Sequence, residues 1–220
     1  MKSKIQKLVN FSNKKESKTT IKILAAVLVV FFTATAFKLV DYVELEIGKA
    51  IPSADVKMMD ISGKEVSLAD AKAENGLLVM FSCNTCPYVK LSESRIKEVS
   101  KLAKANKIGF ILLNSNEAQR TEEDSFDEMK KYARAQGYDF YYVVDKNSAI
   151  ANAFGASRTP HCFLFDKKGL VYRGAIDDNI KSAAEAKEHY LNDAIVAVGT
   201  GKPVKTNSSK SVGCSIKRVE

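Results

Sequence analysis

The order of hydrophobic and polar positions predicts alternating strands and helices. Residues 77–81 form a continuous apolar run of the length of a strand buried on both faces, and residues 108–113 predict a second buried strand. Helix signals follow each run, with Pro87 in a first turn and Gly137 after a last one. The predicted elements are a β-hairpin within 55–68, strands at 77–81, 108–113 and 140–144, helices at 69–74, 87–106, 122–136, 148–154 and 183–198, and a hairpin of strands 162–166 and 171–174.

This order predicts an α/β fold. Strands joined through helices pair in parallel, and the helices cover the faces of the sheet. The late hairpin adds an antiparallel edge, so the central sheet is expected to be mixed, with the first hairpin as an N-terminal extension. Residues 41–199 are predicted to be one domain without internal repeats, and residues 200–220 a polar tail.

The first 40 residues have the pattern of a membrane-targeting segment. Seven lysines precede Ile23, and the chain is then apolar to Phe37 apart from two threonines. Positive charge on the near side predicts a cytoplasmic leader, residues 1–22, and export of the following domain to the periplasm or the outer face of the cytoplasmic membrane. Residues 23–40 are read either as a retained anchor or as a signal peptide, since Ala34-Thr35-Ala36 has the form of a cleavage site.

The net charge of +8 does not indicate nucleic-acid binding. Residues 1–40 carry +7 and residues 200–220 carry +4, whereas residues 41–199 carry −3. A surface that contacts phosphates is expected on the folded body. The charge therefore excludes nucleic acid as a favoured partner, and the leader accounts for most of the basic excess.

The clearest chemistry lies at a predicted strand-to-helix junction, Cys83-Asn84-Thr85-Cys86-Pro87. The unpaired N–H groups and the dipole of a helix start stabilise a thiolate, and two cysteines at this spacing can close a disulfide. We expect Cys83 to be the exposed nucleophile and Cys86 the more buried resolving thiol, in exchange through mixed disulfides. Structural zinc is a weaker reading, because four-ligand zinc needs a second close ligand pair.

A second motif, Thr159-Pro160, precedes the predicted strand 162–166, and together with the cysteine pair it resembles the thioredoxin superfamily. The lead-in from Gly48 to Leu68 resembles the redoxin group that includes alkyl hydroperoxide reductase and thiol-specific antioxidant proteins, and also membrane-tethered thioredoxin-like reductases. Further stretches resemble a little-characterised bacterial redoxin family: Cys83–Lys90, Asn114-Ser115-Asn116, Glu123–Phe126, Phe163–Asp166, Tyr172-Arg173-Gly174, Asp177-Asp178 and Gly213–Lys217.

This resemblance implies a thioredoxin-like fold over about residues 47–198. It implies a cis peptide bond before Pro160, packing of Pro160 against the cysteine pair, and backbone groups of Thr159 that face an extended substrate. Two departures stand out. Ser82 occupies the place where thioredoxins usually have tryptophan, and proline follows the pair instead of lying within it.

Two alternative functions remain open. Peroxiredoxins that resemble this group hold peroxide with a Pro-x-x-x-Thr/Ser-x-x-Cys pattern, which neither cysteine of the pair has. Exported thioredoxin-fold copper carriers use two close cysteines and a distant histidine, so Cys83, Cys86 and His161 could together bind copper. Those carriers have one more residue between the cysteines.

The other cysteines and acidic runs receive simpler interpretations. Cys162 lies in an apolar strand and is expected to be a buried small hydrophobe. Cys214 lies in the basic tail, where it is either a surface thiol or a third redox thiol that folds back to the pair. The run 122–124 is expected to start a helix, and residues 177–178 to form a turn or cap.

The sequence therefore predicts an exported, membrane-tethered thiol-disulfide oxidoreductase. Cys83 and Cys86 carry the exchange, and Thr159 and Pro160 position the substrate. Its partners are protein thiols or disulfides and an upstream thiol electron donor, and exchange needs no dissociable cofactor. The residues between the cysteines do not decide between reductant and oxidant.

Overall fold

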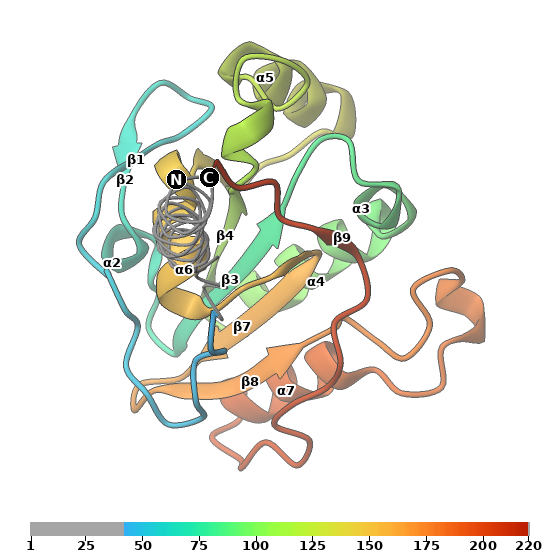
Figure 1. Ribbon diagram of the computed structural model, residues 1–220. Coiled ribbons are helices and arrows are strands. Elements are labelled where there is room, and N and C mark those ends of the chain that lie inside the picture. Colours follow the sequence, from blue (N-terminus) through green and yellow to red (C-terminus); the bar gives the residue numbers. More distant parts are fainter. Residues whose placement is uncertain (1–41, 220) are drawn as a thin grey trace, which may run out of the picture. The chain divides into compact units, whose positions relative to one another are not determined.

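A five-stranded mixed sheet organises the part of the chain that the computed structural model describes, residues 42–219 (Figure 1). The strand order is β5-β4-β3-β7-β8. β3 pairs in parallel with β4, and β4 with β5, whereas β7 is antiparallel to both β3 and β8. The strands are β3 Gly76–Ser82, β4 Ile108–Asn114, β5 Tyr141–Val144, β7 His161–Phe165 and β8 Leu170–Gly174. The predicted α/β fold with a mixed sheet is confirmed.

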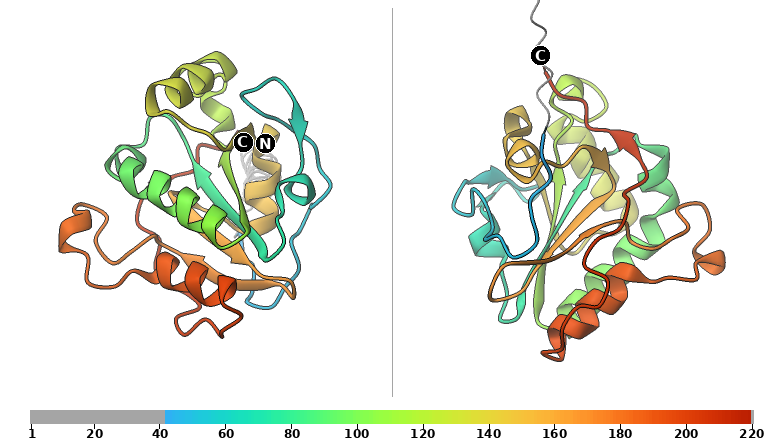
Figure 2. Two further views of the ribbon diagram at one scale, coloured as in Figure 1. Left: turned by 180° about the vertical axis from the view of Figure 1, so that it is seen from behind. Right: turned by 60° about the horizontal axis from the view of Figure 1, so that its bottom comes forward.

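Helices cover both faces of this sheet (Figure 2). One face packs against α4 Glu93–Ala105, α5 Phe126–Gln136 and α7 Tyr190–Gly199. The other packs against α2 Leu68–Ala71 and α6 Ala149–Phe154. Three short 3-10 helices lie in the connections, at Glu117–Gln119, Lys146–Ser148 and Ala183–Glu185.

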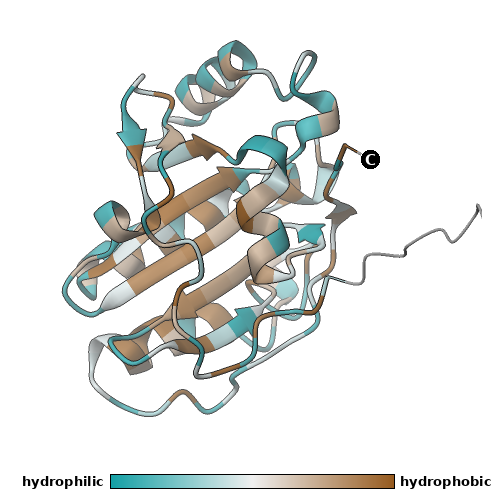
Figure 3. Ribbon diagram, turned by 60° about the vertical axis from the view of Figure 1, so that its left-hand side comes forward, coloured by the Kyte–Doolittle hydropathy of each residue, from teal (hydrophilic) through white to brown (hydrophobic). Residues whose placement is uncertain are grey.

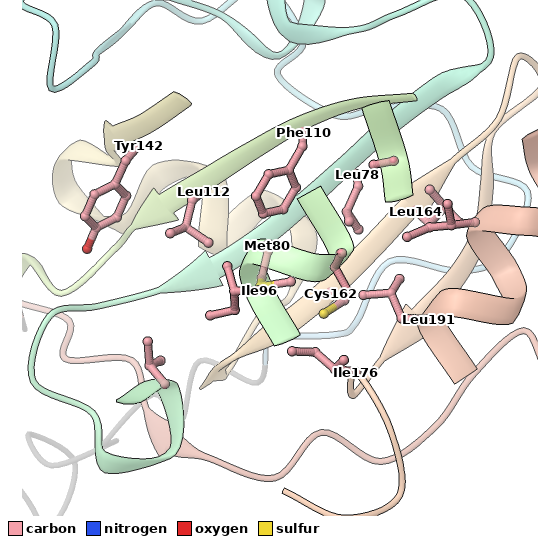
Figure 4. Packing of buried hydrophobic residues seen from close by; sticks show 14 of the residues in the cluster. Leu78, Met80, Ile96, Phe110, Leu112, Tyr142, Cys162, Leu164, Ile176 and Leu191 are labelled. Atoms are coloured by element: carbon pink, nitrogen blue, oxygen red, sulfur yellow. The ribbon is translucent and has the colours of Figure 1, made fainter. Parts of the chain in front are cut away.

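The central strands are buried on both faces, as their apolar runs predict. Alternate residues of a strand point to opposite faces, so Met80 joins the core beneath α4 whereas Phe81 joins the core beneath α6. The apolar colouring of these strands is visible in Figure 3. Figure 4 shows Cys162 packed among Met80, Ile96 and Leu191. Cys162 is 1% exposed, which confirms the prediction of a buried small hydrophobe.

Several predicted helices are shorter than their sequence patterns, and the one predicted at 69–74 already ends at Ala71. The segment predicted as 87–106 divides at Ser92 into α3 Pro87–Leu91 and α4, and the Ser92 hydroxyl donates to the Tyr88 carbonyl. The helix predicted from residue 122 begins at Phe126, because the Ser125 side chain caps it.

The last helix begins at Tyr190, seven residues after its predicted start. The preceding residues instead form a turn, in which the Asp178 carboxylate accepts the backbone N–H groups of Lys187 and Glu188. Residues 177 and 178 are thus loop residues, as expected, but they differ in environment. Asp177 makes a buried ion pair with Arg95 at 2.8 Å.

The two ends of the described chain add small strand pairs. The predicted N-terminal hairpin is present as β1 Met58–Met59 and β2 Glu65–Val66. In the segment predicted as a polar tail, β9 Cys214–Ser215 pairs antiparallel with β6 Arg158–Thr159. Figure 1 shows this segment running from α7 past β8 toward α3. Apolar patterning could not reveal a strand this short.

The predicted membrane segment, residues 23–40, and the leader before it lie outside the described residues. Within residues 42–219, no helix is both long and apolar enough to cross a membrane.

Candidate thiol site

The two cysteines lie at the junction between β3 and the short helix α3. β3 ends at Ser82, and Cys86 is the N-cap residue of α3, with Pro87 in its first turn. Proline fits there because its missing N–H would have no partner inside the helix. The strand fixes one end of the loop and the helix the other, so the two sulfurs are held at the positive end of a helix.

The loop before β7 faces this pair. The Thr159–Pro160 peptide bond is cis, which confirms the expectation. The Cys83 Sγ atom lies 3.5 Å from the Thr159 hydroxyl, and the Cys86 thiol donates to the Thr159 carbonyl at 3.2 Å. The structure therefore brings both cysteines and Thr159 together, with Pro160 directly next in the chain.

The environment of the two sulfurs differs from the expected one. Cys83 and Cys86 are 1% and 2% exposed, so the prediction of an exposed Cys83 is wrong. Cys86 also caps α3, instead of lying within its first turn. Both sulfurs are buried because the loop turns back into the core between β3 and α3, where they join the apolar cluster beneath α4.

Hydrogen bonding within the pair shifts the pKa values of its two thiols in opposite directions. The Cys83 thiol donates to Cys86 and lowers the pKa of Cys86 well below that of an ordinary thiol. Further hydrogen bonds from Cys214, Thr159 and the Val89 backbone N–H act in the same direction. The same hydrogen bond to Cys86, together with burial, raises the pKa of Cys83. Cys86 is therefore the thiol of the pair that loses its proton at the lower pH.

A third thiol lies at the edge of this site. Cys214, on β9, is the register partner of Thr159 and is only partly buried. Burial and its hydrogen bond to Cys86 raise the pKa of Cys214 to about 11. The tail cysteine is therefore placed beside the pair.

A buried carboxylate holds the loop between the cysteines. Asp124 is fully buried, and its Oδ1 atom accepts the Asn84 backbone N–H at 2.8 Å and the Asn114 side-chain amide at 2.7 Å. Its Oδ2 atom accepts the Asn116 amide at 2.9 Å. The Tyr142 hydroxyl in turn donates to the side-chain oxygen Oδ1 of Asn84 at 2.8 Å. Asp124 is thus part of the site, and the expectation that residues 122–124 start a helix is wrong.

These positions were not predicted as site residues. The only signal was that Asn114-Ser115-Asn116 and Glu123–Phe126 belong to stretches that resemble one redoxin family. In the structure these stretches meet at the cysteine loop, and Asn116 also accepts the Lys217 backbone N–H of the tail at 2.9 Å. Their shared role is to position the loop and the tail.

His161 lies on the opposite face of the sheet from the cysteines. Its neighbour Cys162 joins the cluster that contains Cys83 and Cys86, so strand alternation turns the imidazole away. The ring packs on Phe163, with centroids 4.4 Å apart. The copper set of Cys83, Cys86 and His161 is therefore not assembled. Among residues 42–219, no group of three or more His, Cys, Asp or Glu side chains is arranged to hold a metal ion.

Two surface depressions flank the site. One, of about 630 Å³, is lined by Asn84 and Thr85 of the cysteine loop together with residues of α5. The other, of about 280 Å³, is lined by Pro160, Val212 and the loop around Asp177. Both depressions border residues that are close in sequence to the cysteine pair or to Thr159.

Comparison with known proteins decides the family. The Redoxin family model matches residues 46–190, which is more than half of the chain. The chain belongs to the Redoxin family. The resemblance drawn from the cysteine motif and its surroundings is thereby confirmed.

Individual relatives agree with this assignment. An uncharacterized conserved protein from Geobacillus kaustophilus is 32% identical, with a TM-score of 0.73 over 79% of this chain and 93% of that one. The thiol-disulfide oxidoreductase ResA of Geobacillus thermodenitrificans is 23% identical over 69% of this chain and 82% of its own length. The thioredoxin domain of a Bacteroides vulgatus thiol-disulfide oxidoreductase is 18% identical, with a TM-score of 0.52 over 64% of this chain and 97% of that one. This last likeness shows a thioredoxin-like fold.

Proposed function

We propose that this redoxin is a thiol-disulfide oxidoreductase that works through a reversible Cys83–Cys86 disulfide. The observation that carries the proposal is the hydrogen-bonded thiol pair at the start of α3, which faces the Thr159–Pro160 loop. Its relationship to a curated relative named as a thiol-disulfide oxidoreductase supports the same chemistry.

The lowered pKa of Cys86 supports one order of exchange at this site. In the reduced protein, the Cys86 thiolate attacks a sulfur of a partner disulfide, and the other partner sulfur leaves as a thiolate. Cys83 then attacks Cys86, the second partner sulfur leaves, and the Cys83–Cys86 disulfide forms. The partner gains two electrons and the pair loses two, and the reverse sequence oxidises a partner dithiol. This order reverses the roles expected from the sequence.

Several finer points belong to the same proposal. Thr159 and Pro160 position the partner segment, and an upstream protein thiol supplies the electrons when the protein acts as a reductant. The basic leader and the apolar segment 23–40 support action outside the cytoplasm, with the segment as anchor or as signal peptide. No dissociable cofactor takes part in these steps.

The test is catalysis of protein-disulfide reduction by dithiothreitol, measured with full-length protein in detergent. Cys83→Ser and Cys86→Ser are each expected to abolish the acceleration that the wild-type protein gives. Cys162→Ala is the matched control, since it removes a core thiol outside the pair, and it is expected to keep the activity. Full activity in either pair variant would refute the proposal. Peroxide consumption measured on the same samples tests the alternative peroxidase function.

A further inference from the structure

Cys214 is more accessible than the two thiols of the pair. Cys83 and Cys86 are almost completely buried, whereas Cys214 is partly exposed. The Cys86 thiol donates to the Thr159 carbonyl at 3.2 Å, and Cys214 is the register partner of Thr159 on β9. In the described structure, Thr159 therefore brings Cys214 next to the pair, and Cys214 is the most exposed of the three thiols.

The segment that carries Cys214 is tied down before the cysteine. We call residues 207–218 the strap. Its first part runs along β8, where the Arg173 backbone N–H donates to the Asn207 carbonyl at 3.1 Å and the Ser209 N–H donates to the Arg173 carbonyl at 3.0 Å. The Ser209 hydroxyl also lies 2.7 Å from the Tyr172 hydroxyl and accepts the Ala175 N–H at 3.0 Å.

The strap is tied down again after the cysteine. The Ile216 N–H donates to the Ser157 carbonyl at 3.0 Å, and its side chain is buried. The Lys217 N–H donates to Asn116, and the Lys217 carbonyl accepts the Ala118 N–H at 2.9 Å. Anchors on both sides fix where Cys214 lies.

Close backbone packing completes the placement. At Gly213, an added Cβ atom would lie 2.0 Å from the Thr159 carbonyl oxygen. Only glycine allows the strap to approach the Thr159–Pro160 loop this closely. β9 therefore pairs with the backbone at Thr159, which the thioredoxin resemblance assigns to the binding of an extended substrate, and Cys214 is the register partner of Thr159.

From this geometry we propose that Cys214 is the thiol through which the buried pair exchanges with partner proteins, with Cys86 bonded alternately to Cys83 and to Cys214. The proposal rests on the proposed function of the pair, and it places Cys214 between Cys86 and the partner, in place of direct attack by Cys86. The partner is a protein that offers a dithiol or a disulfide to the strap.

Each step is a thiol-disulfide exchange that balances. Starting from the oxidised pair, the Cys214 thiolate attacks Cys86, the Cys86–Cys214 bond forms, the Cys83–Cys86 bond breaks, and Cys83 leaves and takes up the proton that Cys214 gave up. A partner thiolate then attacks Cys214, and Cys86 leaves as a thiolate. The second partner thiol resolves the mixed disulfide, so the partner loses two electrons and the protein gains them.

The first test maps disulfides in full-length Cys83→Ser protein that has been equilibrated in a glutathione redox buffer. The relay predicts a Cys86–Cys214 bond as the main oxidised form. Cys86 bound only to glutathione, with Cys214 free, would overturn the proposal. The wild-type protein reports separately on the proposed function, because its failure would show as the absence of a Cys83–Cys86 bond.

The second test displaces the strap without touching a thiol. In the Cys83→Ser background, Gly213→Ala is expected to lower the yield of the Cys86–Cys214 bond by at least about tenfold. Ser215→Ala, two residues away on the exposed side, is the matched control and is expected to leave the yield unchanged. Gly213→Ala alone must still form the Cys83–Cys86 bond, which shows that the variant folds. An undiminished Cys86–Cys214 bond in the glycine variant would contradict the placement argued here.

The third test separates a relay from a simple cover. Oxidised protein is mixed with a reduced dithiol peptide, and the rate of peptide oxidation is measured. If Cys214 is the point of access, Cys214→Ser slows this step by at least about tenfold, while the Cys83–Cys86 bond still forms in glutathione buffer. If the strap only covers the pair, Cys214→Ser reacts as fast as the wild-type protein or faster, and the relay is refuted.

Discussion

At the scale of single residues, hydrogen bonding at the site lowers the pKa of Cys86. Thiol hydrogen bonds from Cys83 and Cys214 reach this sulfur, which caps a helix, and each lowers the pKa of Cys86. A thiolate is the reactive form in disulfide exchange, so a lowered pKa keeps the pair reactive where an ordinary thiol is protonated.

The charge on Cys86 predicts a distinctive pH dependence of the thiolate absorbance. An ordinary thiol loses its thiolate as the pH falls below about 8.5. Because the pKa of Cys86 is lowered, the reduced protein is expected to keep one thiolate at pH 6, seen as ultraviolet absorbance that Cys86→Ser lacks. If absorbance in the two proteins falls together between about pH 9 and pH 8, the assignment is wrong.

His161 predicts a separate effect on stability. Burial, together with Arg173 and Arg158, lowers the pKa of His161 to about 3. Below about pH 6.5 the unfolded chain binds a proton at His161, whereas the folded chain does not. As the pH falls from about 6.5 to the folded pKa, His161 therefore lowers the free energy of unfolding by about 1.4 kcal/mol per pH unit. Urea unfolding should therefore show His161→Phe gaining stability relative to the wild-type protein as the pH falls from 7 to 4. A constant difference across this range would argue against a buried neutral imidazole.

At the scale of elements, the cysteine loop is held from outside its own strand and helix. Asp124, from the segment before α5, accepts hydrogen bonds from the Asn84 backbone and from two asparagines at the end of β4. Arg120 closes the same segment by donating to the Asp124 carbonyl at 2.6 Å. The loop geometry thus depends on the carboxyl end of β4 as much as on β3.

Removing this carboxylate is expected to loosen the site and lower stability. Asp124→Ala leaves three buried donors without their acceptor, which should cost about 3–5 kcal/mol of the free energy of unfolding. Glu123→Ala, the adjacent exposed carboxylate, is the control and should change stability by no more than about 0.5 kcal/mol. Urea denaturation measures both variants, and equal stabilities would refute the role given to Asp124.

The cysteine motif and the Thr159-Pro160 motif could be predicted from local sequence signals. Cys83, Cys86 and Pro87 lie together at a strand-to-helix junction, and Thr159-Pro160 precedes another strand, so both motifs could be placed from neighbouring residues. The burial of Cys83 could not be predicted from neighbouring residues, because it depends on how the loop packs beneath α4. Asp124 looked like a helix start, since nothing in its own segment shows that it reaches Asn84.

At the scale of the whole molecule, the C-terminal segment packs along the domain and forms one side of the thiol site. The strap crosses from β8 to the Thr159–Pro160 loop and on to the residues after β4, and backbone and side-chain hydrogen bonds join it to segments distant in sequence. A polar composition could not reveal such contacts. The described domain therefore includes its C-terminal segment, which the sequence pattern treated as a separate tail.

The most direct test of the account is the redox equilibrium of the full-length wild-type protein. The protein is equilibrated across a series of glutathione ratios, free thiols are trapped by alkylation, and disulfides are mapped by mass. The account predicts a single reversible Cys83–Cys86 bond that forms and disappears across the series while Cys162 stays reduced. If Cys83 and Cys86 remain reduced at every ratio, the pair is not a redox centre and the proposed function is wrong.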